Sequence, residues 1–397
     1  MAVRTSAWSE PSLAPDRPPA PGRRLWIALI TPCYAPSIGG VETHVERVAT
    51  RLAAWGHRVD VLTQTMEQDR VDVLTQTTEQ DPPSTGPVEG VTVRRFRVPL
   101  ASHNGGFAPG LWTYLSRHGA RYDIVHAHHY HTLPALSAVL AGCRPLVFTP
   151  HYHGAGHSPL RSLLHCPYRR IGARLFARAD RVICNSRAEA DLVRRDFPFV
   201  AERIGVVYPG VDVAALRLAH PYPTRRTVVL TVGRLEGYKN IHKTIEALAY
   251  LDDTFALHVV GDGPALPALR RLAERLGVDD RVVFLGRASD EEVRRWYRTA
   301  AVFVSLSRHE AFGLTLAEAL AAGAGVVASD IPAHRETLTR AAGATSALLP
   351  LDVAPATLAH AIGDRAKDAH RGPMYRVDSW DDVAAGTLAV YRAVVSP

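Results

Sequence analysis

Cysteine is scarce in this sequence, and long apolar runs are missing. The four cysteines, Cys33, Cys143, Cys166 and Cys184, are scattered without a Cys-x-x-Cys pair. This spacing argues against both a disulfide framework and a thiolate zinc site. No apolar run approaches the roughly 18 residues of a membrane span. We therefore expect reduced thiols, a cytoplasmic location and at most peripheral contact with membranes.

Lysine is also scarce. It occurs only at positions 239, 243 and 367, so the net charge of +7 at pH 7 depends mostly on arginine. The arginines are spread along the whole chain and form no single basic stripe. This pattern favours small anionic ligands and does not indicate binding to nucleic acid.

The Gly-x-Gly-x-x-Gly motif of dinucleotide-binding folds is absent. A dinucleotide-dependent oxidoreductase would need this motif between a strand and a helix, because the glycines let the backbone approach the pyrophosphate. We therefore expect no cofactor. Weak affinity for NAD in a binding screen would dispose of the oxidoreductase alternative.

What the sequence does contain is enough apolar residue for two cores, with 47% apolar content over 397 residues. Strand and helix patterns alternate in both halves, which predicts two doubly wound parallel-sheet α/β domains facing across a cleft. A Pro-Gly break at 209–212 separates them. The predicted organisation is a disordered tail at 1–24, a first domain at 25–211, a second domain at 212–377 and a returning helix at 378–397.

The first domain contains a tandem duplication. Residues 58–69 and 70–81 differ at only one position, Met66 against Thr78. One copy suffices for the second strand of the domain, and the first copy directly follows the first helix. We therefore interpret the second copy as an insertion, which a loop absorbs at small entropic cost.

The stretch from Phe303 to Gly323 is the strongest candidate for a ligand site. It predicts a buried strand, an exit loop and a helix that begins near Leu314 after Gly313. The unpaired N–H groups of that first helical turn suit a diphosphate. Glu310 and Glu318 can then point into one crevice at the carboxyl end of the strand, although two glutamates at this spacing also occur by chance on a solvated helix face.

A second strand-to-helix turn carries two cations. Arg234 and Lys239 follow the predicted strand Val228–Val232, where a guanidinium and an ammonium can neutralise a leaving diphosphate. The alternative is that both side chains belong to an ordinary solvated loop.

Two further features stand at strand ends of the first domain. Gly39 and Gly40 precede a predicted helix, which suits a phosphate, although they also fit a plain turn. His151 follows a strand predicted at Pro145–Thr149, where ligands bind in such sheets, although a strand-end histidine with a satisfied hydrogen bond is the plainer interpretation. The histidine-rich segment His126–His131 lacks a carboxylate or cysteine partner, so a metal site is not favoured.

The segment EAFGLTLAE at 310–318 resembles the E-x7-E signature of retaining glycosyltransferases of family 4, which have the GT-B fold. The resemblance covers roughly residues 25–395 and implies that Glu310 contacts the donor sugar and Glu318 the nucleotide ribose. It identifies four catalytic candidates, which are His151, Arg234, Lys239 and Glu310. It implies a donor-binding set of Gly39, Gly40, Arg234, Lys239, Gly263, Arg287, Glu310, Phe312, Gly313, Leu314 and Glu318.

Two positions depart from the family pattern. Leu306 stands where the family usually has proline, and Ala324-Gly325 replaces the common Thr-Pro. We expect these changes to affect the rigidity of the turns without changing which ligand binds.

The resemblance implies a metal-independent transfer of a sugar, with retention, from a nucleotide diphosphate donor of UDP or GDP type. No Asp-x-Asp for a metal-bound diphosphate is present. We expect a small soluble acceptor, such as an amino-cyclitol or another specialised metabolite, and a monomer or homodimer. The alternatives are a lipid or cell-envelope glycan acceptor and a non-catalytic sugar-nucleotide sensor, which should have lost part of the site.

Overall fold

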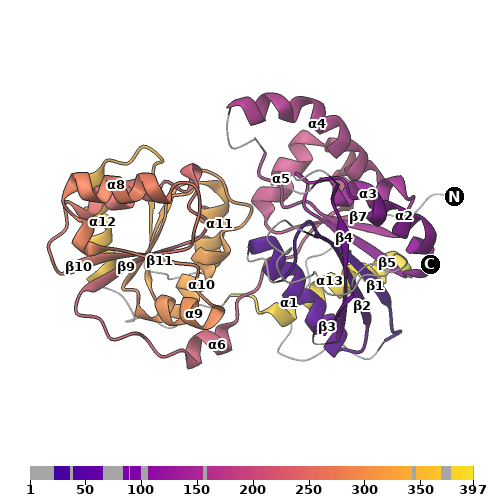
Figure 1. Ribbon diagram of the computed structural model, residues 1–397, viewed down its shortest axis with the longest axis horizontal. Coiled ribbons are helices and arrows are strands. Elements are labelled where there is room, and N and C mark those ends of the chain that lie inside the picture. Colours follow the sequence, from indigo (N-terminus) through magenta and orange to yellow (C-terminus); the bar gives the residue numbers. More distant parts are fainter. Residues whose placement is uncertain are drawn as a thin grey trace. The chain divides into compact units, whose positions relative to one another are not determined.

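The structure is a computed structural model that describes residues 22–35, 39–65, 84–88, 90–99, 106–154, 159–341, 346–367 and 377–396. The chain forms two compact units (Figure 1). The N-terminal unit ends at Pro209 and resumes at Trp380, whereas the C-terminal unit spans Gly210–Ser379. The chain thus returns to the N-terminal unit at Trp380, and the sequence predicts the start of the returning helix at 378.

A mostly parallel sheet forms the centre of the N-terminal unit, in the order β3-β4-β2-β1-β5-β6-β7-β8. Only β3 is antiparallel to its neighbour. The central strands are apolar on both faces, as strands covered by helices on both sides require. The strands are β1 (Trp26–Ile30), β2 (Arg58–Thr65), β3 (Ser84–Val88), β4 (Val91–Arg97), β5 (Ile124–His128), β6 (Leu146–Thr149), β7 (Arg181–Cys184) and β8 (Ile204–Val206).

The helices of the N-terminal unit include the last one of the chain. This helix packs against the first helix, where Arg51 forms an ion pair with Asp381 at 2.6 Å. Its inner face buries Trp380, Val383, Leu388 and Tyr391, as the apolar spacing predicts. The helices are α1 (Gly40–Ala54), α2 (Pro109–His118), α3 (Pro134–Leu140), α4 (Pro159–Arg178), α5 (Arg187–Asp196) and α13 (Trp380–Val395), with 3-10 turns η2 (Gly119–Arg121) and η3 (Pro198–Arg203).

The C-terminal unit is an all-parallel sheet in the order β11-β10-β9-β12-β13-β14. Its strands are β9 (Thr227–Val232), β10 (Phe255–Val260), β11 (Val282–Gly286), β12 (Val302–Ser305), β13 (Gly325–Ser329) and β14 (Ser346–Leu349). Its helices are α6 (Val213–Leu218), α7 (Ile241–Leu248), α8 (Leu266–Leu276), α9 (Asp290–Thr299), α10 (Leu314–Ala322), α11 (Pro332–Arg340) and α12 (Pro355–Lys367), with 3-10 turns η4 (Gly237–Lys239) and η5 (Asp279–Arg281).

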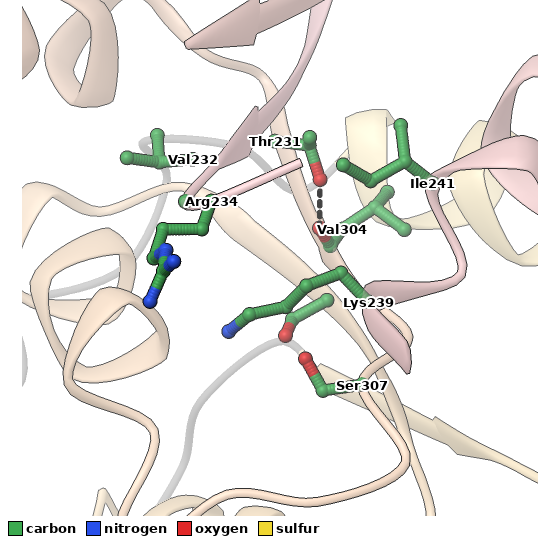
Figure 2. Close-up of a pocket in the computed structure, with 9 residues that line it drawn as sticks. Thr231, Val232, Arg234, Lys239, Ile241, Val304 and Ser307 are labelled. Carbon is green, nitrogen blue, oxygen red and sulfur yellow. Dashed lines mark hydrogen bonds between the residues drawn. The ribbon is translucent and has the colours of Figure 1, made fainter. Parts of the chain in front are cut away.

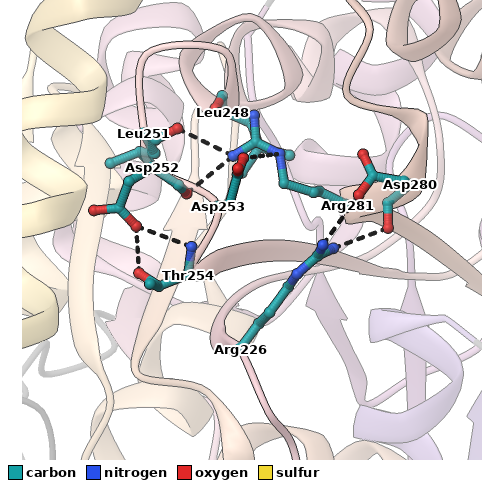
Figure 3. A network of polar contacts seen from close by, with 8 residues as sticks. All are labelled: Arg226, Leu248, Leu251, Asp252, Asp253, Thr254, Asp280 and Arg281. Carbon is teal, nitrogen blue, oxygen red and sulfur yellow. Dashed lines mark hydrogen bonds and ion pairs between the residues drawn. The ribbon is translucent and has the colours of Figure 1, made fainter.

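A buried arginine closes the carboxyl end of α7. Arg281 is 7% exposed and donates to the carbonyl oxygens of Leu248, Leu251 and Asp252 at 3.0–3.1 Å (Figure 3). The last carbonyl groups of a helix lack intrahelical partners, and a cation is favourable there. Arg281 therefore fixes the turn that leads from α7 into β10.

The sequence predicts a strand over Tyr122–His126 and a helix over Leu160–Ala179 that Pro167 interrupts. The strand instead spans Ile124–His128, with both imidazoles buried. The helix is confirmed from Pro159 to Arg178, without an interruption at Pro167. Its second half lies close to the turn after β5, since a Cβ on Gly172 would lie 2.1 Å from the Tyr130 ring.

The first copy of the duplicated segment supplies β2, which pairs with β1 and β4. The second copy, 70–81, lies outside the described residues, as does nearly all of the predicted tail at 1–24. Among the helices that the structure describes, none is both long and apolar enough to cross a bilayer.

Candidate active site

A pocket lies in the C-terminal unit at the carboxyl ends of β9 and β12. These strands are neighbours in the sheet but not in the sequence, and ligands of doubly wound sheets bind at such a switch point. The Thr231 hydroxyl joins the two strands by donating to the Val304 carbonyl at 2.6 Å (Figure 2). The pocket is lined by Thr231, Val232, Gly233, Arg234, Lys239, Ile241, Val304, Ser305 and Ser307.

Two cations of the β9–α7 loop line this pocket. The Arg234 side chain is 74% exposed and stands 3.5 Å from a carboxylate oxygen of Glu236. Lys239 is far less exposed, and its Nζ lies 2.6 Å from Oε1 of Glu310. Arg234 is therefore available to an incoming anion, whereas Lys239 is already engaged with a carboxylate.

The Lys239–Glu310 pair stays ionised although both groups are buried. Burial alone would raise the pKa of Glu310, but the Lys239 ammonium holds the pKa below its usual range. Burial alone would likewise lower the pKa of Lys239, and Glu310 raises it above its usual value. Each charge thus maintains the other in a site that disfavours either one alone.

The first turn of α10 follows the loop that carries Glu310. Gly313 adopts φ of +94°, a conformation that favours glycine, and accepts hydrogen bonds from Leu316 and Ala317. The backbone N–H groups of Leu314 and Thr315 have no acceptor within the helix, as at any helix start. Phe312, just before the turn, is buried. The strand, loop and helix predicted for this stretch are confirmed.

Glu318 is held by a tyrosine. Tyr297 of α9 is buried and donates its hydroxyl to Oε2 of Glu318 at 2.8 Å. Burial and the Glu318 charge together raise the pKa of Tyr297, so it remains a donor at all ordinary pH values. Tyr297 therefore fixes the second carboxylate of the E-x7-E segment.

Glycines bring two loops of the unit together. A Cβ on Gly263 would lie 2.6 Å from the Leu235 carbonyl oxygen, and a Cβ on Gly261 would lie 2.0 Å from that of Gly233. Gly263 therefore holds the β10–α8 loop against the loop that carries Arg234. Arg287, after β11, is mostly exposed and lies 4.0 Å from Asp262.

A buried histidine also borders Gly313. His334 of α11 has no exposed surface, and a Cβ on Gly313 would lie 3.2 Å from its ring. Its Nδ1 lies 3.0 Å from the Ser329 carbonyl oxygen, which can only accept, so Nδ1 carries the proton. Burial lowers the pKa of His334, with an opposing contribution from Glu310.

In the N-terminal unit, His151 follows β6 with φ of +48°. Its Nδ1 lies 2.9 Å from the side-chain nitrogen, Nδ2, of Asn185, and its Nε2 lies 3.5 Å from Nδ1 of His128. Burial, together with the charge that nearby His44 would carry, holds the pKa of His151 well below its usual range. The ring is therefore neutral at physiological pH.

His151 belongs to a cluster of buried imidazoles. His44 of α1 stacks edge-on with His151 and with Trp380 of α13, at centroid distances of 5.7 and 5.8 Å. His126 of β5 binds the Tyr391 hydroxyl of the same helix at 2.6 Å. Within the described part of the chain, no three His, Cys, Asp or Glu side chains are arranged to hold a metal ion.

The two predicted phosphate glycines stand at the start of α1. Gly39 is extended, with φ of −179°, and Gly40 is the first helical residue, so the backbone conformation requires glycine at neither position. A Cβ on Gly40 would meet no atom within 4 Å. Open space beside Gly40 at a helix start is compatible with a ligand, and this assignment remains a prediction.

Comparison with known families identifies the chain. The model for Glycosyltransferase Family 4 matches residues 38–215, and that for Glycosyl transferases group 1 matches residues 213–368. A D-inositol 3-phosphate glycosyltransferase of Acidothermus cellulolyticus is 31% identical over 399 residues, which covers 89% of this chain and 85% of that protein. The chain belongs to glycosyltransferase family 4. A Mycobacterium relative with the same name shares 32% identity over 80% of this glycosyltransferase and 77% of the relative.

Solved structures give the glycosyltransferase a GT-B fold, as the sequence predicts. Sucrose-phosphate synthase of Thermosynechococcus elongatus aligns with a TM-score of 0.68 at 22% identity, covering 93% of this chain and 99% of that one. HepE of Anabaena in complex with UDP and glucose aligns with a TM-score of 0.66 at 22% identity, covering 94% and 95%. At these identities the likeness concerns the fold.

The structure of the glycosyltransferase brings together Lys239, Glu310 and the edge of α10, whereas Arg287 lies out at an exposed loop. Sequence analysis did not single out Tyr297, His334 or Asn185. None of the three belongs to a motif, and Tyr297 and Asn185 are recognisable by their contacts with residues distant in sequence. The one local signal was that Asn185 directly follows the end of β7.

Proposed function

We propose that this glycosyltransferase moves a sugar from a nucleotide diphosphate donor to a small soluble acceptor, with retention at the anomeric carbon. The observation that carries the proposal is the Lys239–Glu310 pair, with Nζ 2.6 Å from Oε1, beside a pocket that Lys239 lines together with Arg234. Two cations at a switch point suit a diphosphate that gains charge as it leaves. A carboxylate beside them suits the hydroxyls of the transferring sugar.

In the proposed reaction, the bond from the anomeric carbon to the phosphate oxygen breaks on the face where the acceptor oxygen bonds. The acceptor proton passes to the leaving phosphate. Arg234 and Lys239 stabilise the charge on the diphosphate. Glu310 orients the sugar and Glu318 binds the ribose. His151 contacts the donor sugar or the acceptor. Because the two cations supply positive charge at the diphosphate, we propose that transfer needs no divalent metal ion.

Two comparisons support the choice of substrates. The relatives are named for D-inositol 3-phosphate, a small polar cyclitol derivative, and HepE was solved with UDP-glucose. We therefore propose a UDP- or GDP-linked donor and a cyclitol or a similar small polyol as acceptor.

The test is donor hydrolysis across a panel of UDP-, GDP- and ADP-sugars, with and without excess EDTA. We expect one base to be preferred and activity to survive EDTA. Full loss with rescue by a divalent ion would contradict metal independence, and no turnover of any donor by a folded protein would favour a sensor.

Two experiments test the acceptor. Transfer is measured with cyclitols and cyclitol phosphates, and binding to anionic liposomes is measured by sedimentation. The Arg174 and Arg178 side chains near the end of α4 are the basic groups that a membrane would contact first. Tight sedimentation with liposomes at physiological salt, abolished by substituting both arginines, would contradict the small acceptor.

A further inference from the structure

We propose that Asn185 and Glu189 are positioning residues that together set the orientation and the tautomer of the His151 ring. The inference rests on the proposed function, in which His151 takes part in transfer. All the contacts that carry it lie within the N-terminal unit.

Glu189 holds two backbone segments with one carboxylate. It lies in the first turn of α5 and is 1% exposed. One oxygen accepts from the amide of Tyr152, the residue after His151, and the other accepts from the amide of Asn185 at 2.6 Å. The Ser186 hydroxyl accepts from the Glu189 amide at 2.9 Å and fixes the start of the helix. The loop after β6 is thereby tied to the end of β7.

This clamp explains how His151 maintains its backbone conformation. A φ of +48° places a non-glycine residue in the left-handed region, which is unfavourable for any residue with a Cβ. Such a conformation persists where neighbouring contacts determine it. The bond from the Tyr152 amide to Glu189 is the contact next to His151 that does so.

Asn185 acts on the ring itself. Its side-chain nitrogen lies 2.9 Å from Nδ1 of His151, and an amide nitrogen can only donate. Nδ1 therefore accepts, and the single proton of the neutral ring resides on Nε2. The Nε2–H of this tautomer lies 3.5 Å from Nδ1 of His128, so Nε2 can donate a hydrogen bond, to His128 or to an oxygen atom of a substrate, and is not a base.

Burial of a carboxylate such as that of Glu189 is unfavourable unless hydrogen bonds satisfy its oxygens. Burial raises the pKa of Glu189 to about 8, although the amides of Asn185 and Tyr152 oppose the shift, so the carboxylate with two accepting oxygens is the predominant form above about pH 8. A glutamine has one acceptor oxygen and satisfies only one of the two amides. The geometry thus requires a side chain with two acceptors.

The first test is the tautomer, read from the ring 15N chemical shifts of His151 in full-length protein without ligand, with His151→Ala to assign the signals. We expect the Nε2–H form in the wild type. Asn185→Asp places an acceptor at Nδ1, so we expect the Nδ1–H form and a pKa for His151 that is higher by at least ~1 unit. An unchanged tautomer in folded Asn185→Asp would overturn the proposal.

The second test is hydrolysis of UDP-glucose, or of the panel donor that turns over. We expect kcat to fall at least ~10-fold in Glu189→Gln and Asn185→Asp, with donor KM nearly unchanged. Asp191→Asn, on the same helix but exposed in an ion pair with Arg194, is the matched control and should equal the wild type.

The outcomes separate the two claims. If His151→Ala is impaired while folded Asn185→Asp and Glu189→Gln turn over normally, the positioning role is wrong and the proposed function stands. If His151→Ala turns over like the wild type, the role of His151 in the proposed function fails, and with it the purpose of positioning the ring. Should Glu189→Gln fail to fold, Asn185→Asp alone decides.

Discussion

Lys239 and Glu310, which are 71 positions apart in the sequence, meet with Nζ 2.6 Å from Oε1. The side chains retain only 18% and 19% of their exposure. An arriving diphosphate has to share the lysine with the carboxylate.

Removal of either pocket cation should slow transfer. We expect Arg234→Ala and Lys239→Ala each to lower kcat/KM by roughly 100-fold or more, because charge stabilisation of the leaving diphosphate is lost. The measurement is steady-state kinetics with the preferred donor. Lys367→Ala, which removes an exposed lysine paired with Asp364, is the control. Near-wild-type turnover in both site variants would refute the phosphate assignment.

The two glutamates should have different phenotypes. We expect Glu310→Gln to lower turnover and Glu318→Ala to weaken donor binding, because in the proposed function the first contacts the sugar and the second the ribose. Tyr297→Phe deletes the hydroxyl that binds Glu318, so it should reproduce a milder form of the Glu318 effect. Donor titration separates binding from turnover, and exchanged phenotypes would show that the roles are reversed.

Acid should destabilise the N-terminal unit through its buried imidazoles. Burial lowers the pKa of His44 and His129 to about 4 and that of His126 to about 3, below the usual 6.5 of an unfolded chain. The unfolded state therefore binds more protons, so stability is complete above pH 6.5 and is lost as the pH falls toward 4.

A substitution can isolate one of these protons. We expect His44→Gln to reduce the pH dependence of the unfolding free energy by about 1.4 kcal/mol per pH unit between pH 6 and 5, as removal of one titrating group requires. Calorimetry at several pH values measures it. His360→Gln, at an exposed histidine of α12, should leave the dependence unchanged. Equal slopes in the wild type and His44→Gln would contradict the neutral, buried state of His44.

Arg281 should matter for stability and not for catalysis. Replacement by alanine removes three hydrogen bonds to carbonyl groups of Leu248 and of the turn after α7, so we expect a loss of roughly 2–4 kcal/mol in the C-terminal unit. Arg281→Lys should recover part of it. Denaturant unfolding measures the loss, and activity per folded molecule should be unchanged.

The duplicated segment offers a deletion test. Since the first copy forms β2, we expect removal of residues 70–81 to leave a folded, active enzyme. Retained donor hydrolysis and an unaltered melting temperature would support the insertion. Aggregation of the deletion would mean that the second copy is structural.

Local signals were sufficient where the chain follows local rules. The strand and the helix Leu314–Ala322 were both predictable, because an apolar run and an alanine-rich segment each favour one structure. The departure at 325 has an explanation that only the structure provides, because a side chain on Gly325 would lie 2.6 Å from the Arg365 carbonyl oxygen of α12. The leucine at 306 has no structural explanation.

The histidine cluster shows why the remainder was not predictable. His126 and His128 look like the polar end of a strand, yet His126 is satisfied by Tyr391, 265 positions away, and by Thr149. A buried polar residue needs a partner, and no local pattern tells which distant residue supplies it. Glu189 was missed for the same reason, since its two donors belong to different loops.

The return of the chain to the N-terminal unit at Trp380 has a consequence for synthesis. Because α13 supplies Tyr391 to His126 and Trp380 to His44, this unit lacks part of its core until the last helix has left the ribosome. The C-terminal unit is encoded without interruption from Gly210 to Ser379, so it has all its strands earlier. The half of the enzyme that is translated first is therefore the last that can complete its fold, and a truncation that removes α13 would leave it unfinished.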